Sequence, residues 1–174
     1  MDDNVNLRTS RNVDLQSIFE KMILKVVENA KLELQDIIQK NSSNSKCKCV
    51  IFDIDDTLVT NQNNPIKHVI NLYKYISEDL KIKIFIITAR RQTNEYQTRK
   101  LLEDIKIDNY ENLFLRSNYY MKNVSFYKYE IRREISENYS IIANIGNYYS
   151  DFFGGFNGLI VRIPTLIECM DQII

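Results

Sequence analysis

The chain has 174 residues, with 23 basic and 23 acidic side chains and a formal net charge of zero. This length suits one domain with a sizeable core and is too short for two substantial domains. The balanced charge does not favour nucleic acid or an anionic membrane as an obligate partner, so a substrate would have to be recognised locally.

The N-terminal part predicts a helical extension. Residues 1–12 are polar and lack the apolar core of a secretory signal, and no stretch is suited to span a membrane, so we expect an intracellular, cytoplasmic location by default. From 13 to about 40, apolar residues recur with helical spacing on one face. We therefore divide the chain into a helical extension packed on the core, 1–45, which ends in a polar linker, and a main domain, 46–174.

Short apolar segments alternate with helical patterns in the main domain. The expected strands span 47–52, 82–88, 113–115, 140–145 and 159–163. One expected helix follows a polar loop at 60–65 and carries the apolar residues from Ile66 to Ile76, and two further helices are expected at 92–105 and 128–138. Largely apolar strands separated by helices predict a parallel sheet covered on both faces, which is an α/β fold. Ligands of such sheets bind beyond the carboxyl ends of the strands, where Asp53, Thr88 and Gly146 fall.

The first strand also contains two of the three cysteines. Cys47 and Cys49 lie two residues apart on one face of it, and the third is Cys169. An odd number of cysteines does not make a disulfide framework. We interpret all three as small core residues, with zinc binding as the weaker alternative.

An acidic turn follows the first strand. Asp53 and Asp55 are two residues apart, so they lie on the same side if the extended backbone continues. Two like charges this close repel each other unless a cation neutralises them. Mg2+ prefers oxygen ligands of this kind, and a phosphate oxygen can complete its coordination. The turn therefore predicts a metal-assisted phosphate site.

Four ordered segments resemble the motifs of the haloacid dehalogenase-like (HAD) phosphatases. These segments are Asp53–Thr57, Ile84–Thr88, Lys128 and Gly146–Asp151. Other segments resemble the acid phosphatase branch, subfamily IIIB, which includes plant vegetative storage proteins: Thr88–Arg90, Leu113–Arg116, Tyr127–Arg132 and Ile142–Gly146. The resemblance extends from about Cys47 to Pro164. It implies a Rossmannoid three-layer sandwich with a central parallel sheet. Because Thr60–Leu80 holds only a loop and one helix, we expect a minimal cap in addition to the N-terminal helix.

The resemblance implies a role for each acidic residue of the turn, and the chemistry of carboxylates supports these roles. Asp53 would be the nucleophile that forms an aspartyl-phosphate. Asp55 would protonate the leaving oxygen and then activate water, while its backbone carbonyl contributes to the metal. Asp56 is expected to support the turn.

Three further residues are candidates for binding the phosphate. Thr88, at the end of a strand just before a helix, would offer its hydroxyl and nearby backbone N–H groups. Lys128 would place a compact cation against the phosphate and Asp53. Arg90 could contact the substrate, or it could be an exposed arginine at a helix start.

The fourth motif departs from the family pattern. Related phosphatases have an aspartate that ligates Mg2+ where this chain has Asn147. An amide oxygen can ligate, but the site loses one negative charge, so Mg2+ affinity should fall. Asp151 would compensate in part, either directly or through water. The expected metal residues are therefore Asp53, Asp55, Asn147 and Asp151.

These observations predict a Mg2+-dependent phosphomonoesterase of the acid phosphatase type. Its partner would be a phosphate monoester, with no obligate nucleic acid and no membrane; the sequence does not define the oligomeric state. The alternative, based on Asn147, is a catalytically weakened storage or binding protein that keeps the phosphatase scaffold.

Overall fold

The computed structural model describes residues 3–40 and 46–170, with side chains from Leu15 onward except that of Met170. The strands of this part of the chain form one five-stranded parallel sheet in the order β3-β2-β1-β4-β5. They are β1 (Cys47–Phe52), β2 (Lys83–Arg91), β3 (Asn112–Arg116), β4 (Tyr139–Gly146) and β5 (Leu159–Arg162). The parallel sheet confirms the predicted α/β fold.

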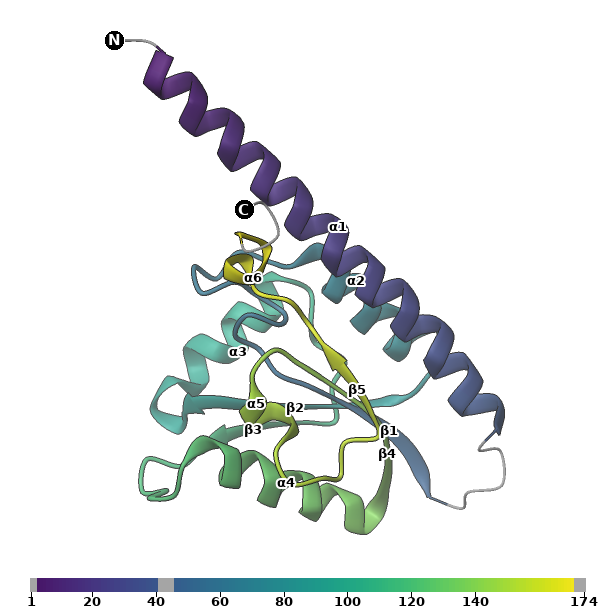
Figure 1. Cartoon of the computed structure of the whole chain (residues 1–174). Coiled ribbons are helices and arrows are strands. Elements are labelled where there is room, and N and C mark those ends of the chain that lie inside the picture. The colour runs from purple at the N-terminus through teal and green to yellow at the C-terminus, as the bar shows by residue number, and fades with distance from the viewer. Residues whose placement is uncertain (1–2, 41–45, 171–174) are drawn as a thin grey trace.

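Helices cover both faces of this sheet (Figure 1). One face is covered by α1 (Asp3–Lys40), α2 (Lys67–Lys74) and α3 (Glu95–Asp104), and the other by α4 (Val124–Asn138). A π-helical turn, Tyr75–Asp79, continues α2. The sequence patterns did not predict the two short helices α5 (Tyr149–Phe152) and α6 (Leu166–Met170). The helix–sheet–helix layers are those of the predicted three-layer sandwich.

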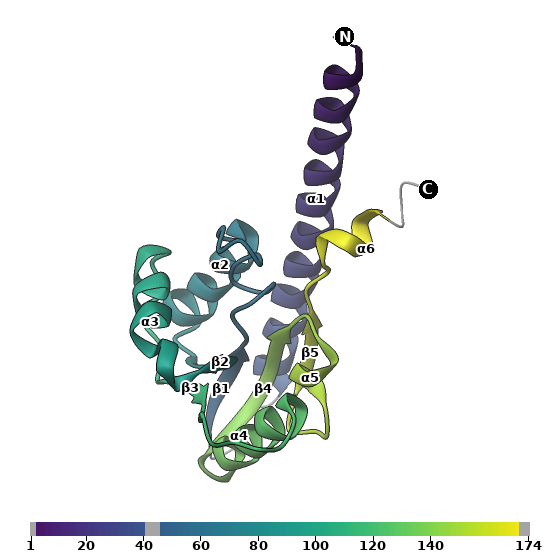
Figure 2. The same cartoon turned by 90° about the vertical axis from the view of Figure 1, so that its left-hand side faces the viewer.

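The N-terminal helix is longer than the apolar pattern predicts. It begins at Asp3 instead of near residue 13, and its first part projects away from the body of the molecule (Figure 2). Its buried face contains Phe19, Ile23, Val27 and Leu34, which pack into the main core. The predicted linker, 41–45, lies outside the described residues, and the division of the chain at residue 45 stays a prediction. In the part of the chain that the structure describes, no helix is long and apolar enough to cross a membrane.

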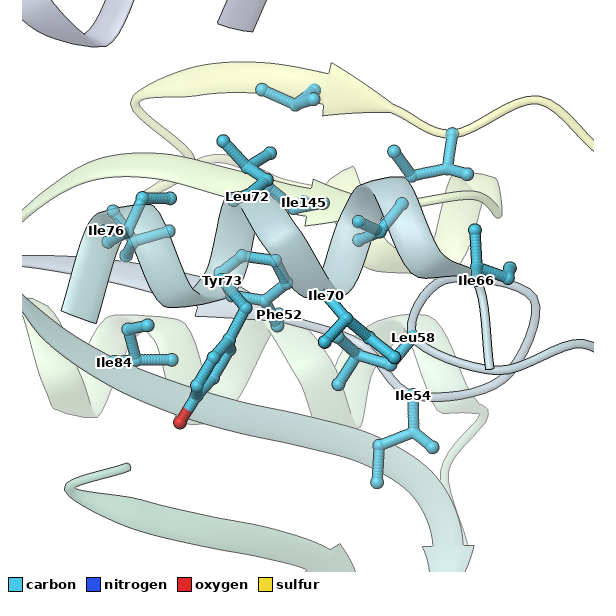
Figure 3. Packing of buried hydrophobic residues seen from close by; sticks show 14 of the residues in the cluster. Phe52, Ile54, Leu58, Ile66, Ile70, Leu72, Tyr73, Ile76, Ile84 and Ile145 are labelled. Carbon is cyan, nitrogen blue, oxygen red and sulfur yellow. The ribbon is translucent and has the colours of Figure 1, made fainter. Parts of the chain in front are cut away.

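The main core lies between the sheet and α2 and anchors the acidic turn (Figure 3). The rings of Phe52 on β1 and Tyr73 on α2 meet edge to face, with centroids 5.4 Å apart. At one end of this cluster the buried side chains of Ile54, Leu58 and Ile66 pack together. Because these residues flank the acidic turn and the loop at 60–65, the core fixes both against the sheet.

A second, smaller core lies between the sheet and α4. Successive strand residues point to opposite faces, so Val50 and Phe52 belong to the main core, while Cys49 and Ile51 face α4. Asp53 continues the second set, which directs it towards the α4 side. The expectation of buried cysteines is right for Cys49 and Cys169 and wrong for Cys47, which is exposed.

Two element boundaries near the expected site differ from the prediction. Strand β2 continues through Arg91, and a 3-10 turn, Gln92–Asn94, precedes α3, so Thr88 does not stand at the start of a helix. Helix α4 begins at Val124, because the Asn123 side chain caps it by accepting a hydrogen bond from the Phe126 N–H. Lys128 therefore lies inside the helix, on its first turns.

Candidate active site

The site is built around Asp53, the first residue after β1. Its backbone N–H donates a hydrogen bond of 3.0 Å to the carbonyl oxygen of Ile145 on β4, which extends the sheet pairing by one residue. Its side chain is buried, with the whole residue 5% exposed. The neighbouring β4 ends at Gly146 and leads directly into Asn147. The predicted residues of the first and fourth motifs thus meet at the carboxyl edge of the sheet.

Lys128 joins two carboxylates in this buried place. Its Nζ donates to Asp53 Oδ1 at 2.6 Å and to Asp151 Oδ1 at 2.5 Å. The lysine is only 3% exposed, so solvent hardly screens either contact. Lys128 of the third motif thus contacts both Asp53 of the first motif and Asp151 of the fourth.

Burial and the charge of the ion-pair partner act against each other on the pKa of Asp53 and of Lys128, and both values are raised. Burial raises the pKa of Asp53 to about 7, although the ammonium of Lys128 acts against this rise, and the Asp151 carboxylate adds to it. For Lys128, burial acts to lower the pKa, but Asp53 and Asp151 outweigh it and raise the value. When all three groups are ionised, two carboxylates face one ammonium, and the cluster has an excess negative charge that a cation would neutralise.

Asp151 uses both carboxylate oxygens within the protein. Oδ1 accepts from Lys128, and Oδ2 accepts from the backbone N–H groups of Asn147 and Tyr148, each at 2.9 Å. A Cβ at Gly146 would lie 2.5 Å from Asp151 Oδ2, so only glycine permits this close approach. Asp151 therefore fixes both the turn that carries Asn147 and the ammonium of Lys128.

Asn147 is buried with its polar atoms unsatisfied. It is 2% exposed, and within the described residues neither its Oδ1 nor its Nδ2 has a hydrogen-bond partner. Leaving buried polar atoms unpaired costs free energy, so such atoms in a folded protein call for an unseen partner such as an ion or a water.

A hard divalent cation fits these residues. The Asp53 carboxylate and the unpaired amide oxygen of Asn147 are oxygen donors of the kind that such a cation prefers, and the excess negative charge of the cluster favours it as well. The described residues contain no group of three or more His, Cys, Asp or Glu side chains that could hold a metal. A cation here would thus depend on carbonyl and amide oxygens as well as carboxylates.

Arg90 binds the carboxylate of Asp55. Its Nε donates to both oxygens, at 3.2 and 3.1 Å, and its Nη2 donates to Oδ1 at 2.6 Å. The same Nη2 reaches Asn63 Oδ1 at 3.1 Å, in the loop at 60–65. Arg90 lies on β2 and is partly buried, so it is not an exposed arginine at a helix start. It connects the expected general acid to the loop beside it.

The remaining predicted residues have local roles in the structure. Asp56 has a positive φ of 53° and accepts hydrogen bonds from the Asn61 N–H at 3.0 Å and the Tyr148 hydroxyl at 3.1 Å. These contacts close the acidic turn. Thr88 is fully buried, and its Oγ1 accepts from the Arg90 N–H at 3.2 Å. The expectation that Thr88 ends a strand just before a helix is wrong, because β2 continues past it.

Sequence reasoning did not identify several residues around the site. Asn63, Asn144 and Arg132 were not selected, although each makes hydrogen bonds to a site residue or its loop. The one available signal was the spacing of Lys128 and Arg132, four residues apart on a predicted helix, which places both on one face. Nothing in the sequence indicated which residues their charged groups would meet.

Comparison with known proteins identifies the family. The model of the HAD superfamily, subfamily IIIB (acid phosphatase), matches residues 61–164. This match includes Thr88, Lys128 and the segment from Asn147 to Asp151, and it begins after the acidic turn. No curated protein matches the chain.

Solved structures share the fold. The class C acid phosphatase from Bacillus anthracis is similar with a TM-score of 0.61 and 18% identity, over 89% of this chain and 71% of that chain. Its tungstate-bound structure gives 0.62 and 16%, over 84% and 77%. A chain of the Pnkp1/Rnl/Hen1 complex gives 0.59 and 20%, over 70% of this chain and 47% of that chain. At these identities the likeness shows a common fold.

Proposed function

Because the chain belongs to the HAD superfamily, subfamily IIIB, of acid phosphatases, we propose that it is a Mg2+-dependent phosphomonoesterase that acts through an aspartyl-phosphate on Asp53. Family membership makes it a hydrolase of phosphoric monoesters. The observation that supports the finer proposal is the buried contact between Asp53 and Lys128, which holds a carboxylate next to a fixed positive charge at the carboxyl edge of the sheet.

In the first half of the reaction, a carboxylate oxygen of Asp53 attacks phosphorus in line with the ester bond. The P–O bond to the leaving group breaks, and the leaving oxygen takes a proton from Asp55. Lys128 stabilises the charge on the phosphoryl oxygens, because its ammonium is buried and already oriented. The products are the released alcohol and an aspartyl-phosphate.

In the second half, water attacks the same phosphorus atom and gives a proton to the Asp55 carboxylate. The bond between phosphorus and the Asp53 oxygen breaks, which releases inorganic phosphate and restores the Asp53 carboxylate. Asp55 suits this exchange because its side chain is 42% exposed and can reach solvent. Arg90 keeps that carboxylate in place between the two proton transfers.

The substrate phosphate would be bound by Lys128, by Thr88 and by Arg90. Lys128 offers the closest cation, and Thr88 lies on the adjacent strand with its hydroxyl at the same edge of the sheet. Arg90 is engaged with Asp55 and Asn63, so it would reach the phosphate or leaving group only by giving up one of these contacts. The cap formed by Thr60–Leu80 is small, which suits an accessible phosphate ester.

Mg2+ would be held by Asp53, the backbone carbonyl of Asp55 and the amide oxygen of Asn147. When bound, it supplies positive charge that offsets the negative charges of the phosphate and of Asp53. Asp151 supports this set indirectly, because its two oxygens are already bound by Lys128 and by the backbone of Asn147 and Tyr148. An amide in place of a carboxylate lowers the affinity for the metal.

The test is turnover of p-nitrophenyl phosphate together with trapping of labelled phosphate on the protein. We expect Mg2+-dependent turnover that EDTA abolishes, and an acid-stable covalent label on the wild type. Asp53→Asn should lose both turnover and label, whereas Asp104→Asn, at an exposed position on α3, should keep both. Undiminished turnover in Asp53→Asn would exclude Asp53 as the nucleophile.

A second candidate function is storage or binding on a catalytically weakened phosphatase scaffold. The observation that favours it is Asn147, which stands where the resemblance to related phosphatases implies a metal-binding aspartate. The substitution Asn147→Asp separates the two candidates. Turnover by the wild type excludes the weakened scaffold, and turnover that appears only in Asn147→Asp excludes the enzyme.

A further inference from the structure

Helix α4 contributes a second buried cation to the neighbourhood of the site. Arg132 lies four residues after Lys128, which puts both side chains on the same face of the helix. It is 1% exposed and is the largest of the fully buried side chains. The proposed mechanism gives Arg132 no chemical role, so its burial needs another explanation.

All hydrogen bonds of the Arg132 guanidinium go to one short segment. Nη1 donates to the carbonyl oxygen of Asp151 at 2.6 Å, Nε donates to that of Gly155 at 3.1 Å, and Nη2 donates to that of Phe153. The three acceptors belong to residues 151–155, at the end of α5 and in the turn after it. A planar guanidinium binds separated carbonyls through three different nitrogens, whereas the donors of an ammonium all lie on one nitrogen.

Asn144 also binds the backbone carbonyl of Asp151. Its Nδ2 donates to the Asp151 carbonyl oxygen at 2.7 Å and to Asn157 Oδ1 at 2.9 Å. The backbone carbonyl of Asp151 is thus bound by Arg132 and Asn144, and its carboxylate by Lys128 and two backbone N–H groups. Both ends of Asp151 are fixed, and α4 supplies a cation to each.

Burying the Arg132 charge is costly. Burial lowers its pKa to about 10, although the charge of Asp151 acts against this decrease, and its hydrogen bonds go to neutral backbone carbonyls. A neutral apolar side chain would pack α4 against this segment at a lower cost in desolvation. What the guanidinium adds is a fixed position for residues 151–155, and therefore for the Asp151 carboxylate.

We propose that Arg132 is a positioning residue for phosphoryl transfer. By holding the carbonyls of residues 151–155 it fixes Asp151, and through Asp151 it fixes the ammonium of Lys128 against Asp53 and the turn that contains Asn147. This proposal rests on the proposed function, because Arg132 would fix the positions of the catalytic groups of that same site. A displacement of about 1 Å in such a group costs up to about 100-fold in rate.

The first test compares Arg132→Lys with Arg133→Gln, a control at the next residue of α4, which is exposed. Arg132→Lys keeps the charge, but its donors all lie on one nitrogen and cannot take the places of Nε, Nη1 and Nη2, so kcat/KM for p-nitrophenyl phosphate should fall about 10- to 100-fold. The control should stay within about twofold of the wild type. The urea unfolding midpoint of each variant is measured in the same samples, so that loss of folded protein is separated from loss of rate.

The second test uses Arg132→Ala and methylguanidinium at concentrations well below those that denature. The ion should restore part of the lost kcat/KM in Arg132→Ala, and methylammonium of the same concentration should not. A structural role alone predicts recovery only in step with the fraction of folded protein. If Arg132→Ala does not fold, the kcat/KM and the unfolding midpoint of Arg132→Lys together test the positioning role of Arg132.

Tungstate binding provides a readout that needs no turnover. Calorimetry should show at least about tenfold weaker binding of tungstate to Arg132→Lys than to the wild type and to Arg133→Gln, because tungstate mimics the phosphate that Lys128 would contact. Wild-type kcat/KM and tungstate affinity in a folded Arg132→Lys would overturn the proposal for Arg132. Absence of turnover in the wild type would instead overturn the proposed function, while the tungstate comparison still tests the positioning of Lys128.

Discussion

Lys128 and Asp53 form an ion pair of 2.6 Å that is almost completely buried, although 75 residues separate them in the chain. Lys128 binds Asp151 at the same time, so one ammonium holds two carboxylates that would otherwise repel each other in a low-dielectric environment. The contact is therefore part of the stability of the fold as well as of the proposed chemistry.

Replacing Lys128 should lower the stability of the folded protein. Lys128→Met leaves Asp53 and Asp151 buried without their cation, and removal of one partner of a buried ion pair costs about 3–5 kcal/mol. We expect a clear decrease in the urea unfolding midpoint. Lys122→Met, which removes an exposed ion pair with Glu130, should leave the midpoint near that of the wild type. Equal midpoints for wild type and Lys128→Met would show that the pair is not formed.

The proton transfer assigned to Asp55 should appear as a dependence on the leaving group. A poor leaving group such as phenolate needs the proton, and dinitrophenolate does not. We expect Asp55→Asn to slow phenyl phosphate hydrolysis by about 10²- to 10⁴-fold and 2,4-dinitrophenyl phosphate hydrolysis much less. Because Arg90 orients Asp55, Arg90→Gln should show a weaker loss with the same dependence. Equal losses for both substrates would remove Asp55 from proton transfer.

Binding of Mg2+ should stabilise the folded protein. At a Mg2+ concentration ten times its Kd the free energy of unfolding should rise by about 1.4 kcal/mol, and EDTA should reverse the effect. Thermal unfolding with and without Mg2+ measures this without any substrate. Asn147→Ala should abolish the shift and Asn147→Asp should increase it, whereas Asn118→Ala, at an exposed position, should retain it. An unchanged shift in Asn147→Ala would place the ion elsewhere.

Alkaline pH should destabilise the fold through Cys49. Burial raises the pKa of this thiol from 9.0 to about 12, so between these values the unfolded chain loses a proton that the folded chain keeps. The stabilising effect is complete below pH 9 and is lost as pH rises towards 12, at up to about 1.4 kcal/mol per pH unit. Burial also raises the pKa of Tyr73 and Tyr127, which act in the same direction above pH 10.

Urea unfolding at a series of pH values from 8 to 11 measures this loss. Cys49→Ala should remove the part of the decrease that begins near pH 9, and Cys47→Ala, at the exposed cysteine, should not. The same pH dependence in Cys49→Ala and the wild type would mean that the Cys49 thiol ionises equally in the folded and unfolded chains.

Much of the fold could be predicted from local patterns. Alternation of apolar strands and helical segments gave the parallel sheet, and the period of two along β1 correctly separates Phe52 from Cys49 and Ile51 on opposite faces. The ends of the strands were harder to predict. Strand β2 continues to Arg91 because Arg91 pairs with β3, and the sequence of β2 alone does not indicate this pairing. The short helices α5 and α6 have too few residues to show a period.

The type and order of its residues determined which chemistry this chain is suited to, because the acidic turn after β1, Lys128 and the Asn147–Asp151 segment are local features of the sequence. Only the tertiary structure decided which of these groups meet. The strand order puts β4 beside β1. Helix α4 packs on the face of the sheet towards which Asp53 is directed, so Lys128 lies between Asp53 and Asp151, and Arg132 reaches the carbonyl of Asp151. Such contacts depend on three elements at once, and no periodicity within a single element encodes them.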